Sequence, residues 1–216
     1  MNPRHCWRDL SLGCDGQRAA AERPVIDLTD LLDDPQALRE RVLVLRAQLG
    51  DRAAFHELVT LYQERLTYYV HRLVQDWHQS SDILQQVWLD VFRTLGKLQS
   101  PGAFRVWLYR IAHDRAVTFI RRQRVDSDAR ELLAFDAIET EHWNDLDLLE
   151  NADLVHFALN KLSVVHREIM TLRFLEEMDV KDIAHVLQCS EGTAKSRLHY
   201  AKIAMRRAIS EEQDHA

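Results

Sequence analysis

The sequence predicts an all-α protein built from two helical domains joined by an acidic linker. Apolar residues recur at helical spacing over most of the chain, and no stretch shows a convincing strand pattern. The 216 residues include only 6 Gly and 4 Pro, which disfavours β folds rich in tight turns. A chain of this length is long enough for one or two domains with cores of their own.

Charge is segregated along the chain, although the net charge is only −6. Residues 39–125 hold 14 basic and 8 acidic groups, residues 126–153 hold 1 and 10, and residues 154–216 hold 9 and 9. Such blocks indicate separate parts with separate partners. We therefore divide the chain into a flexible arm over residues 1–36, a helical domain over 37–124, an acidic linker over 125–153 and a second helical domain over 154–210.

The first helical domain is expected to begin with two helices. Asp34 caps the first helix, Pro35 begins it and Gly50 ends it, while Asp51 opens the second. Each helix carries an apolar stripe that we expect to face the core. The stripes are Leu38, Val42, Leu45 and Leu49 in the first helix, and Phe55, Leu58, Val59, Tyr62, Leu66, Tyr69 and Leu73 in the second.

Two further helices complete this domain. Residues 78–81 are predicted as a connector, residues 82–98 as a third helix, residues 96–102 as a loop and residues 103–122 as a fourth helix. A short helix near residues 132–138 is compatible with the linker sequence. The expected core positions are Leu84, Val87, Trp88, Val91, Leu95 and Leu98 in the third helix, and Phe104, Leu108, Ile111 and Ala112 in the fourth.

The second domain begins near Leu154, with Ser163 as a helix cap, and ends in a helix-turn-helix pattern. Its first helices are expected to bury Leu162, Val165, Ile169 and Leu172. Val180, Ile183, Ala184 and Leu187 then recur at the spacing of a short amphipathic helix, and Ser190 is placed to cap the next one. That last helix has an apolar stripe at Ala194, Leu198, Ala201, Met205 and Ala208. Five basic side chains and no acid lie between Lys195 and Arg207. This geometry suits insertion into a DNA major groove, although a helical hairpin inside another all-α domain would share the pattern.

Several classes of protein are disfavoured. No apolar run approaches the roughly 18 residues of a membrane span, so we expect no membrane insertion. The widely spaced Cys6, Cys14 and Cys189 indicate a reducing cytoplasm and, with His5, do not match a metal site. Histidines could supply acid–base groups, but the chain has no phosphate loop and no nucleophile motif. We therefore expect no catalytic residue, no metal and no cofactor.

Three motifs carry a resemblance to a known family. They are D-I-L-Q-Q-V-W at residues 82–88, F-R-V-W-L-Y-R-I-A at 104–112 and G-T-A-K-S-R-L-H-Y-A at 192–201. In this order and at these separations, they make the chain resemble a bacterial RNA polymerase sigma factor of the two-domain, extracytoplasmic-function group of the sigma-70 family. The resemblance covers about residues 40–210. It implies that residues 37–124 form a region 2-like domain and residues 154–210 a region 4-like domain.

The resemblance implies that the third helix docks on the clamp of the polymerase's large subunit. Amides and carboxylates suit an interface that forms and dissolves in each transcription cycle. The family has an acid where this chain has Gln86, and an ordinary solvated helix face would look the same from these residues alone. The candidate polymerase contacts are Asp82, Gln85, Gln86, Asp90 and Arg93.

The fourth helix mixes arginines with aromatic rings, which suits phosphate binding and stacking on melted strands. The resemblance implies that this helix and the loop before it recognise the −10 promoter element and capture an unstacked base. Trp107 fits the core equally well, and Asp114, where the family usually has Asn, would repel phosphate. The candidate contacts are Lys97, Arg105, Trp107, Tyr109, Arg110, Arg115, Arg121 and Arg122.

The second helix of the helix-turn-helix is implied to meet the −35 element. Lysine, arginine and hydroxyl groups near a helix N-terminus favour phosphate and base-edge acceptors. The family often has Arg where this chain has Tyr200, and Arg197 could instead form an ion pair inside the second domain. The candidate contacts are Ser190, Thr193, Lys195, Ser196, Arg197, His199 and Tyr200.

The function implied is that of a sigma factor, which is not an enzyme but gives core RNA polymerase its promoter specificity in the cytoplasm. The implied partners are core RNA polymerase, promoter DNA and an anti-sigma factor. The acidic linker is implied to thread the RNA exit path, although a solvated tether fits its composition equally well. The alternative is a stand-alone helix-turn-helix transcription regulator, which would bind specific DNA tightly without polymerase.

Overall fold

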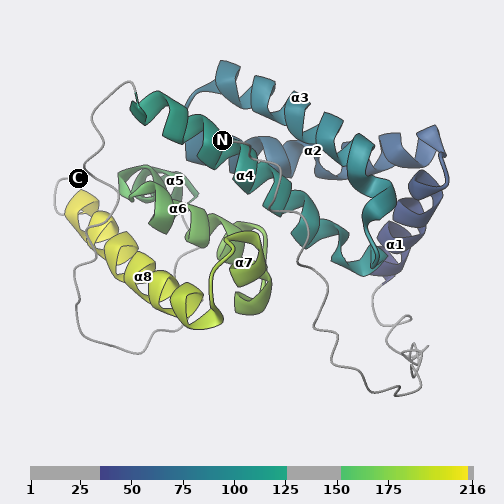
Figure 1. The fold of residues 1–216 in the computed structure, drawn as a ribbon. Helices are drawn as coiled ribbons and strands as arrows, with labels where there is room; N and C mark the ends of the chain where they lie inside the picture. Colours follow the sequence, from purple (N-terminus) through teal and green to yellow (C-terminus); the bar gives the residue numbers. More distant parts are fainter. Residues whose placement is uncertain (1–34, 126–151, 214–216) are drawn as a thin grey trace, which may run out of the picture. The chain divides into compact units, whose positions relative to one another are not determined.

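The computed structural model describes residues 35–125 and 152–213, and all regular structure in those two ranges is helical (Figure 1). The all-α prediction is therefore confirmed. The predicted arm and linker, with the short helix near residues 132–138, fall almost wholly outside the described residues. None of the described helices has the length and apolar character needed to cross a membrane.

The first bundle contains four helices: α1 (Pro35–Gln48), α2 (Arg52–Val74), α3 (Trp77–Thr94) and α4 (Phe104–Val125). The long helices α2, α3 and α4 pack side by side (Figure 1). Two short 3-10 turns, Leu95–Lys97 and Pro101–Ala103, occupy most of the predicted loop before α4. Gln48 holds this loop in place, because its Nε2 donates to the carbonyl oxygens of Leu95 and Leu98 at 2.9 and 2.7 Å.

The boundary between α1 and α2 is as predicted. Gly50 has φ +92°, a left-handed conformation that glycine adopts without strain. Asp51 then caps α2, because its carboxylate accepts hydrogen bonds from the backbone nitrogens of Ala53 and Ala54 at 2.9 and 3.1 Å. Six of the seven predicted core positions of α2 lie in or against the core, and the seventh, Val59, is half-buried.

The predicted connector over residues 78–81 is wrong, because α3 already begins at Trp77. Its cap is Asp76, whose carboxylate accepts from the backbone nitrogen of Gln79 at 3.0 Å. Gln75, at φ 58°, ends α2 immediately before it, so the two helices need only a two-residue link. The third helix also ends at Thr94 rather than near Leu98, because the chain tightens there into a 3-10 turn.

The predicted inward stripe of α1 is also wrong. Leu38, Val42, Leu45 and Leu49 are 37 to 88% exposed, whereas Leu43 and Val44 are buried. This helix is apolar on two sides, and periodicity alone does not say which side meets α2. On the side that packs inward, the Tyr62 hydroxyl of α2 also donates to the carboxylate of Glu40.

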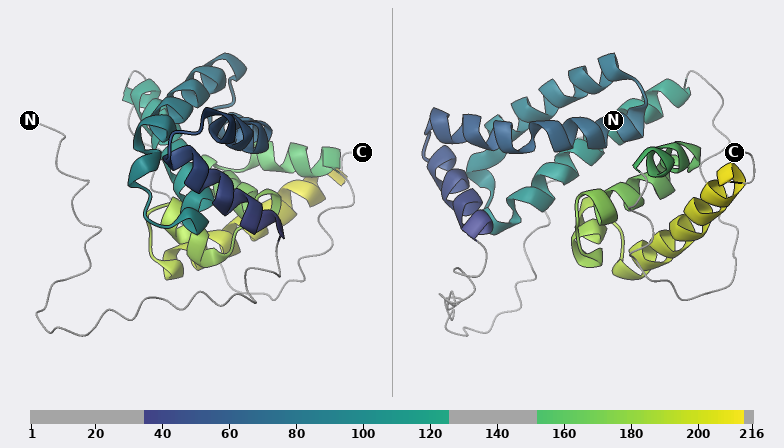
Figure 2. Two further views of the ribbon diagram at one scale, coloured as in Figure 1. Left: turned by 90° about the vertical axis from the view of Figure 1, so that its right-hand side faces the viewer. Right: turned by 180° about the vertical axis from the view of Figure 1, so that it is seen from behind.

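The second bundle contains α5 (Ala152–Lys161), α6 (Val164–Met170), a π-helical turn (Thr171–Leu175), α7 (Val180–Val186) and α8 (Glu191–Gln213). Ser163 caps α6 as predicted, accepting from the backbone nitrogen of His166 at 3.3 Å. Helices α5 and α6 pack along α8 (Figure 2). All five residues of the predicted apolar stripe of α8 are buried.

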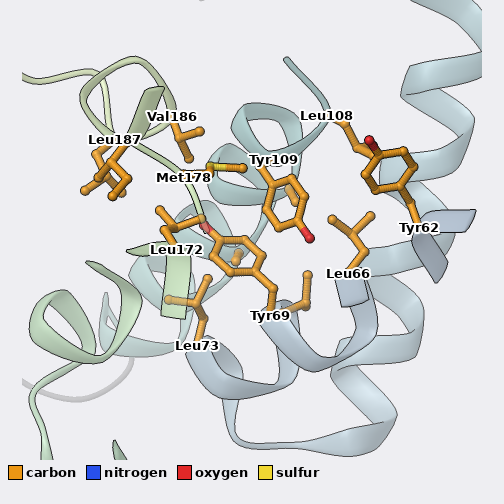
Figure 3. Close-up of a cluster of buried hydrophobic side chains, with 14 of the residues drawn as sticks. Tyr62, Leu66, Tyr69, Leu73, Leu108, Tyr109, Leu172, Met178, Val186 and Leu187 are labelled. Carbon is orange, nitrogen blue, oxygen red and sulfur yellow. The ribbon is translucent and has the colours of Figure 1, made fainter. Parts of the chain in front are cut away.

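The buried side chains of the two bundles form one continuous core within residues 36–216 (Figure 3). Leu66, Tyr69 and Leu73 of α2 lie in the same cluster as Leu172 and Met178 of the second bundle. The rings of Tyr69 and Tyr109 meet edge to face, with their centroids 5.2 Å apart. This shared core determines which predicted functional side chains are accessible.

Candidate polymerase and nucleic-acid interfaces

The outer face of α3 carries the predicted polymerase contacts. Asp82, Gln85, Gln86 and Arg93 are all exposed, opposite the buried Ile83, Leu84, Val87 and Val91. Asp90 is half-buried and differs from the other four predicted contacts. Its carboxylate accepts from Nε of Arg115, on α4, at 2.6 Å. Asp90 and Arg115, which the sequence assigns to two different surfaces, therefore pair with each other.

This face also presents two apolar side chains that the sequence analysis did not select. Leu89 is 44% exposed and Phe92 is 62% exposed. At 100° per residue, Leu89 falls between Gln85 and Asp82 on the helix surface. Phe92 lies at the edge of this set beside Gln85, where its ring meets that of Phe55 on α2 edge to face, with the centroids 5.3 Å apart. The signal was available, since both are apolar residues outside the core stripe of α3. A protein interface favours apolar side chains with a polar rim, whereas a solvated face does not require them.

The predicted −10 contacts fall into accessible and covered groups. Four of them are exposed: Lys97, Arg115, Arg121 and Arg122. Of these, Arg115 is paired with Asp90. Three others are half-buried: Arg105, Trp107 and Arg110. Tyr109 is fully buried, and its hydroxyl donates to the carboxylate of Glu176 in the second bundle. In this conformation Tyr109 is thus a packing residue between the bundles. Trp107 packs against Phe104, with the ring centroids 6.0 Å apart.

Asp114 contacts the helix-turn-helix. Its carboxylate accepts from Nε2 of Gln188, in the turn between α7 and α8, at 2.6 Å. Burial raises the pKa of Asp114, although His113 and Arg110 partly offset this effect. The carboxylate that would repel DNA phosphate therefore has a partner inside the protein.

The helix-turn-helix has the predicted form. Gln188 in the turn has φ 52°, and Ser190 caps α8 by accepting from the backbone nitrogen of Thr193 at 3.1 Å. Lys195 and Ser196 are exposed, whereas Thr193, Arg197, His199 and Tyr200 are half-buried. Within the described ranges Arg197 forms no ion pair, and its Nε is buried without a hydrogen-bond partner. The structure therefore does not support the alternative that Arg197 forms an ion pair inside the second domain.

No group of three or more potential metal ligands comes together within residues 35–125 and 152–213. The arrangement instead presents an amphipathic helix face, a cationic helix and loop, and a capped basic helix, all of which are surfaces for macromolecules.

Comparisons with known proteins place both helical bundles in one family. Residues 58–125 match the family model "Sigma-70 region 2", and residues 152–205 match "Sigma-70, region 4". The chain is 34% identical over 182 residues to the RNA polymerase sigma-H factor of Pseudomonas aeruginosa, a match that covers 79% of this chain and 94% of that one. It is 32% identical over 181 residues to the ECF RNA polymerase sigma-E factor of Haemophilus influenzae, covering 77% and 93%.

Two solved structures share the fold. One is the sigma factor RpoE in complex with the anti-sigma factor NepR from Bartonella quintana, with a TM-score of 0.55 and 22% identity over 72% of this chain and 96% of that one. The other is CnrH in complex with the cytosolic domain of CnrY, with a TM-score of 0.56 and 19% identity over 80% and 98%.

Proposed function

This chain belongs to the extracytoplasmic-function group of the sigma-70 family, and we propose which part of a sigma factor's function each of its two bundles performs. A sigma factor directs core RNA polymerase to promoters and binds promoter DNA through its helix-turn-helix. Residues 37–124 correspond to region 2 and residues 154–210 to region 4. An arm over residues 1–36 precedes the first domain, and a linker over residues 125–153 joins the two. The protein acts in the cytoplasm as an initiation factor, with no catalytic step of its own.

The outer face of α3 is the proposed docking surface for the clamp of the polymerase's large subunit. The observation that carries this assignment is the exposure of Leu89 among Asp82, Gln85, Gln86 and Arg93, with the exposed Phe92 at the edge of the same face. Apolar side chains inside a polar rim are the usual composition of a protein interface.

The N-terminal half of α8 is the proposed reader of the −35 element. Lys195 and Ser196 are exposed two turns or less from the helix N-terminus, where the backbone dipole also favours phosphate. Lys97, Arg121 and Arg122 supply the accessible cations for the −10 region.

Changing Lys195→Glu is expected to weaken transcription from a promoter with an intact −35 element about tenfold or more, because an attractive phosphate contact becomes repulsive. The measurement is run-off transcription with purified core polymerase. The control is Arg207→Glu, which makes the same charge change on the same helix at a side chain paired with Glu211. Equal losses in both variants would contradict a local role for Lys195.

The class of protein is tested by run-off transcription from a genomic fragment library with core polymerase plus this chain. New start sites that depend on the protein are the expected result. A stand-alone regulator would instead bind specific fragments tightly without polymerase and create no start sites.

An anti-sigma factor is the proposed third partner. The support is the fold likeness to RpoE and CnrH, whose structures contain an anti-sigma factor and the cytosolic domain of CnrY respectively. The exposed apolar side chains of α3 are a surface that such a partner would have to cover to block polymerase.

A further inference from the structure

Helix α1 carries an apolar stripe on the side that faces away from the core. Its members are Leu38, Val42, Leu45 and Leu49, with exposed fractions of 37, 45, 49 and 88%. At 100° per residue they fall within about 60° of one another, opposite the mean direction of the buried Leu43 and Val44. We call this stripe the outer seam of α1. It lies at one end of the first bundle (Figure 1), where none of the described helices covers it.

The spacing of the outer seam is that of a coiled coil. Intervals of four, three and four residues place Leu38 and Leu45 at d positions and Val42 and Leu49 at a positions of a heptad repeat. Leu49 follows the last residue of α1, but its backbone nitrogen still donates to the carbonyl oxygen of Leu45 at 3.2 Å, so the stripe continues. Single exposed apolar residues are common on protein surfaces, whereas a contiguous stripe marks an interaction site. The seam therefore fits a second helix that lies along α1.

The positions that flank the outer seam carry positive charge and no acid. The e positions are Arg39 and Arg46, and the g positions are Arg41 and Gln48. The single acid of α1, Glu40, lies on the core side, where its carboxylate accepts from the Tyr62 hydroxyl. Charges at e and g positions form ion pairs between the helices of a coiled coil and set the choice of partner. The charge complementary to this rim is therefore negative.

Neighbouring acids neutralise the rim only in part. Nη2 of Arg39 lies 3.5 Å from the carboxylate of Glu57 on α2, and the Arg39 side chain remains 76% exposed. Nη2 of Arg46 lies 2.7 Å from the carboxylate of Asp51, and the Arg46 side chain remains 49% exposed. Exposed ion pairs of this kind contribute little free energy. A carboxylate on an incoming helix therefore replaces either acid at low cost.

A second copy of this chain is a poor occupant of the seam. In a parallel pair, a g position of one helix meets the next e position of the other, which places Arg41 beside Arg46 of the second copy. In an antiparallel pair, e positions meet each other, which places Arg39 beside Arg46 of the second copy. Both arrangements bring like charges together, and this repulsion disfavours self-association.

We propose that the outer seam of α1 is a docking site for an acidic amphipathic helix of another protein, with aliphatic residues at a and d and Glu or Asp at e and g. The two helices form a short heterotypic coiled coil. Helix α1 is already fixed to its bundle, because Gln48 donates to the carbonyl oxygens of Leu95 and Leu98. Only the incoming helix therefore loses conformational freedom on binding. The site lies outside the proposed surfaces on α3, α4 and α8 and goes beyond the proposed function.

The test measures binding of a labelled synthetic helix to the full chain by fluorescence anisotropy. The probe has three heptads with Val at a, Leu at d and Glu at e and g, and the matched control peptide has Lys in place of these Glu residues. We expect a dissociation constant below about 100 μM for the acidic peptide, weakened by added salt, and binding at least tenfold weaker for the basic peptide. Equal binding of the two peptides would overturn the proposal, and so would a failure of the acidic peptide to bind.

Variants locate the binding surface. Leu45→Asp is expected to weaken binding of the acidic peptide at least tenfold, because it places an unpaired charge inside the seam. The matched control Leu61→Asp makes the same change at a leucine of α2 that is 39% exposed, and it should leave binding unchanged. Arg39→Glu should weaken the acidic peptide at least threefold and strengthen the basic one. Circular dichroism checks that each variant is folded, and equal losses in the two leucine variants would remove the seam as the binding surface.

Two other occupants would give different results, and either would overturn the proposal. Dimerisation in analytical ultracentrifugation that Leu45→Asp abolishes would assign the seam to a second copy of the chain. Binding of the acidic peptide only after Asp27, Asp30, Asp33 and Asp34 are changed to Asn would assign it to the N-terminal residues of the chain itself. These measurements use neither polymerase nor DNA, so the docking site and the proposed sigma function succeed or fail separately.

Discussion

The double variant Asp82→Arg with Gln85→Arg is expected to lose polymerase pull-down by about 100-fold or more, without unfolding the first bundle. Both side chains are exposed on α3, so the change adds positive charge without disturbing the core. Like charge placed in an interface costs several kcal/mol, and about 2.8 kcal/mol corresponds to 100-fold in affinity. The measurement is pull-down of purified core polymerase, with circular dichroism as a check of folding.

The matched control is His56→Arg with Glu64→Arg. These positions are exposed on α2, and the change in formal charge at pH 7 is the same. The control should keep pull-down close to that of the unchanged protein. Comparable losses in both variants would show an effect of net charge, and unchanged pull-down in the first variant would refute the assignment of α3.

The apolar part of this surface can be tested separately. If Leu89 and Phe92 make the central contacts, truncating either should weaken polymerase binding more than truncating Gln86, which lies toward the polar rim. This ranking follows from the general observation that a few large, desolvated side chains carry most of the energy of an interface. An anti-sigma factor that covers α3 should be sensitive to the same truncations.

Elements with one apolar side could be predicted from the sequence, and the others could not. The stripes of α2 and α8 lie where predicted, because each helix has a single apolar face and a recognisable cap at Asp51 or Ser190. Helix α1 has two apolar faces, so its periodicity does not say that Leu43 and Val44, rather than Leu38 and Val42, are buried. The start of α3 was missed because the cap at Asp76 is followed by one exposed apolar residue, Trp77, and then by the polar residues 78–82, which show no apolar periodicity.

The recognition surfaces could be predicted from composition and motifs, but their accessibility could not. Tyr109 belongs to an arginine-rich helix and looks like a DNA contact, yet it is buried against Glu176, 67 positions away in the sequence. In the same way, the sequence around Glu168 gives no sign that this carboxylate is buried. Contacts between distant segments determine both outcomes, and local periodicity carries no information about them.

Arg167 is expected to be the most costly single side chain to remove from the second bundle. It is 4% exposed, and its guanidinium donates to four carbonyl oxygens. These belong to Leu159 (2.9 Å), Leu162 (2.8 Å), Asn160 (3.3 Å) and Arg72 (2.8 Å). The guanidinium thus satisfies the end of α5 and, through Arg72, helps to satisfy the end of α2.

Changing Arg167→Met keeps the aliphatic volume but leaves several buried carbonyl groups without a donor. Each such group costs about 1–3 kcal/mol, so the free energy of unfolding should fall by roughly 3–5 kcal/mol. Urea denaturation followed by circular dichroism measures this change. The control Arg207→Met removes an exposed arginine paired only at the surface with Glu211, and it should change stability by less than about 1 kcal/mol. A loss for Arg167→Met no larger than that of the control would mean that water, rather than the guanidinium, satisfies these carbonyl groups.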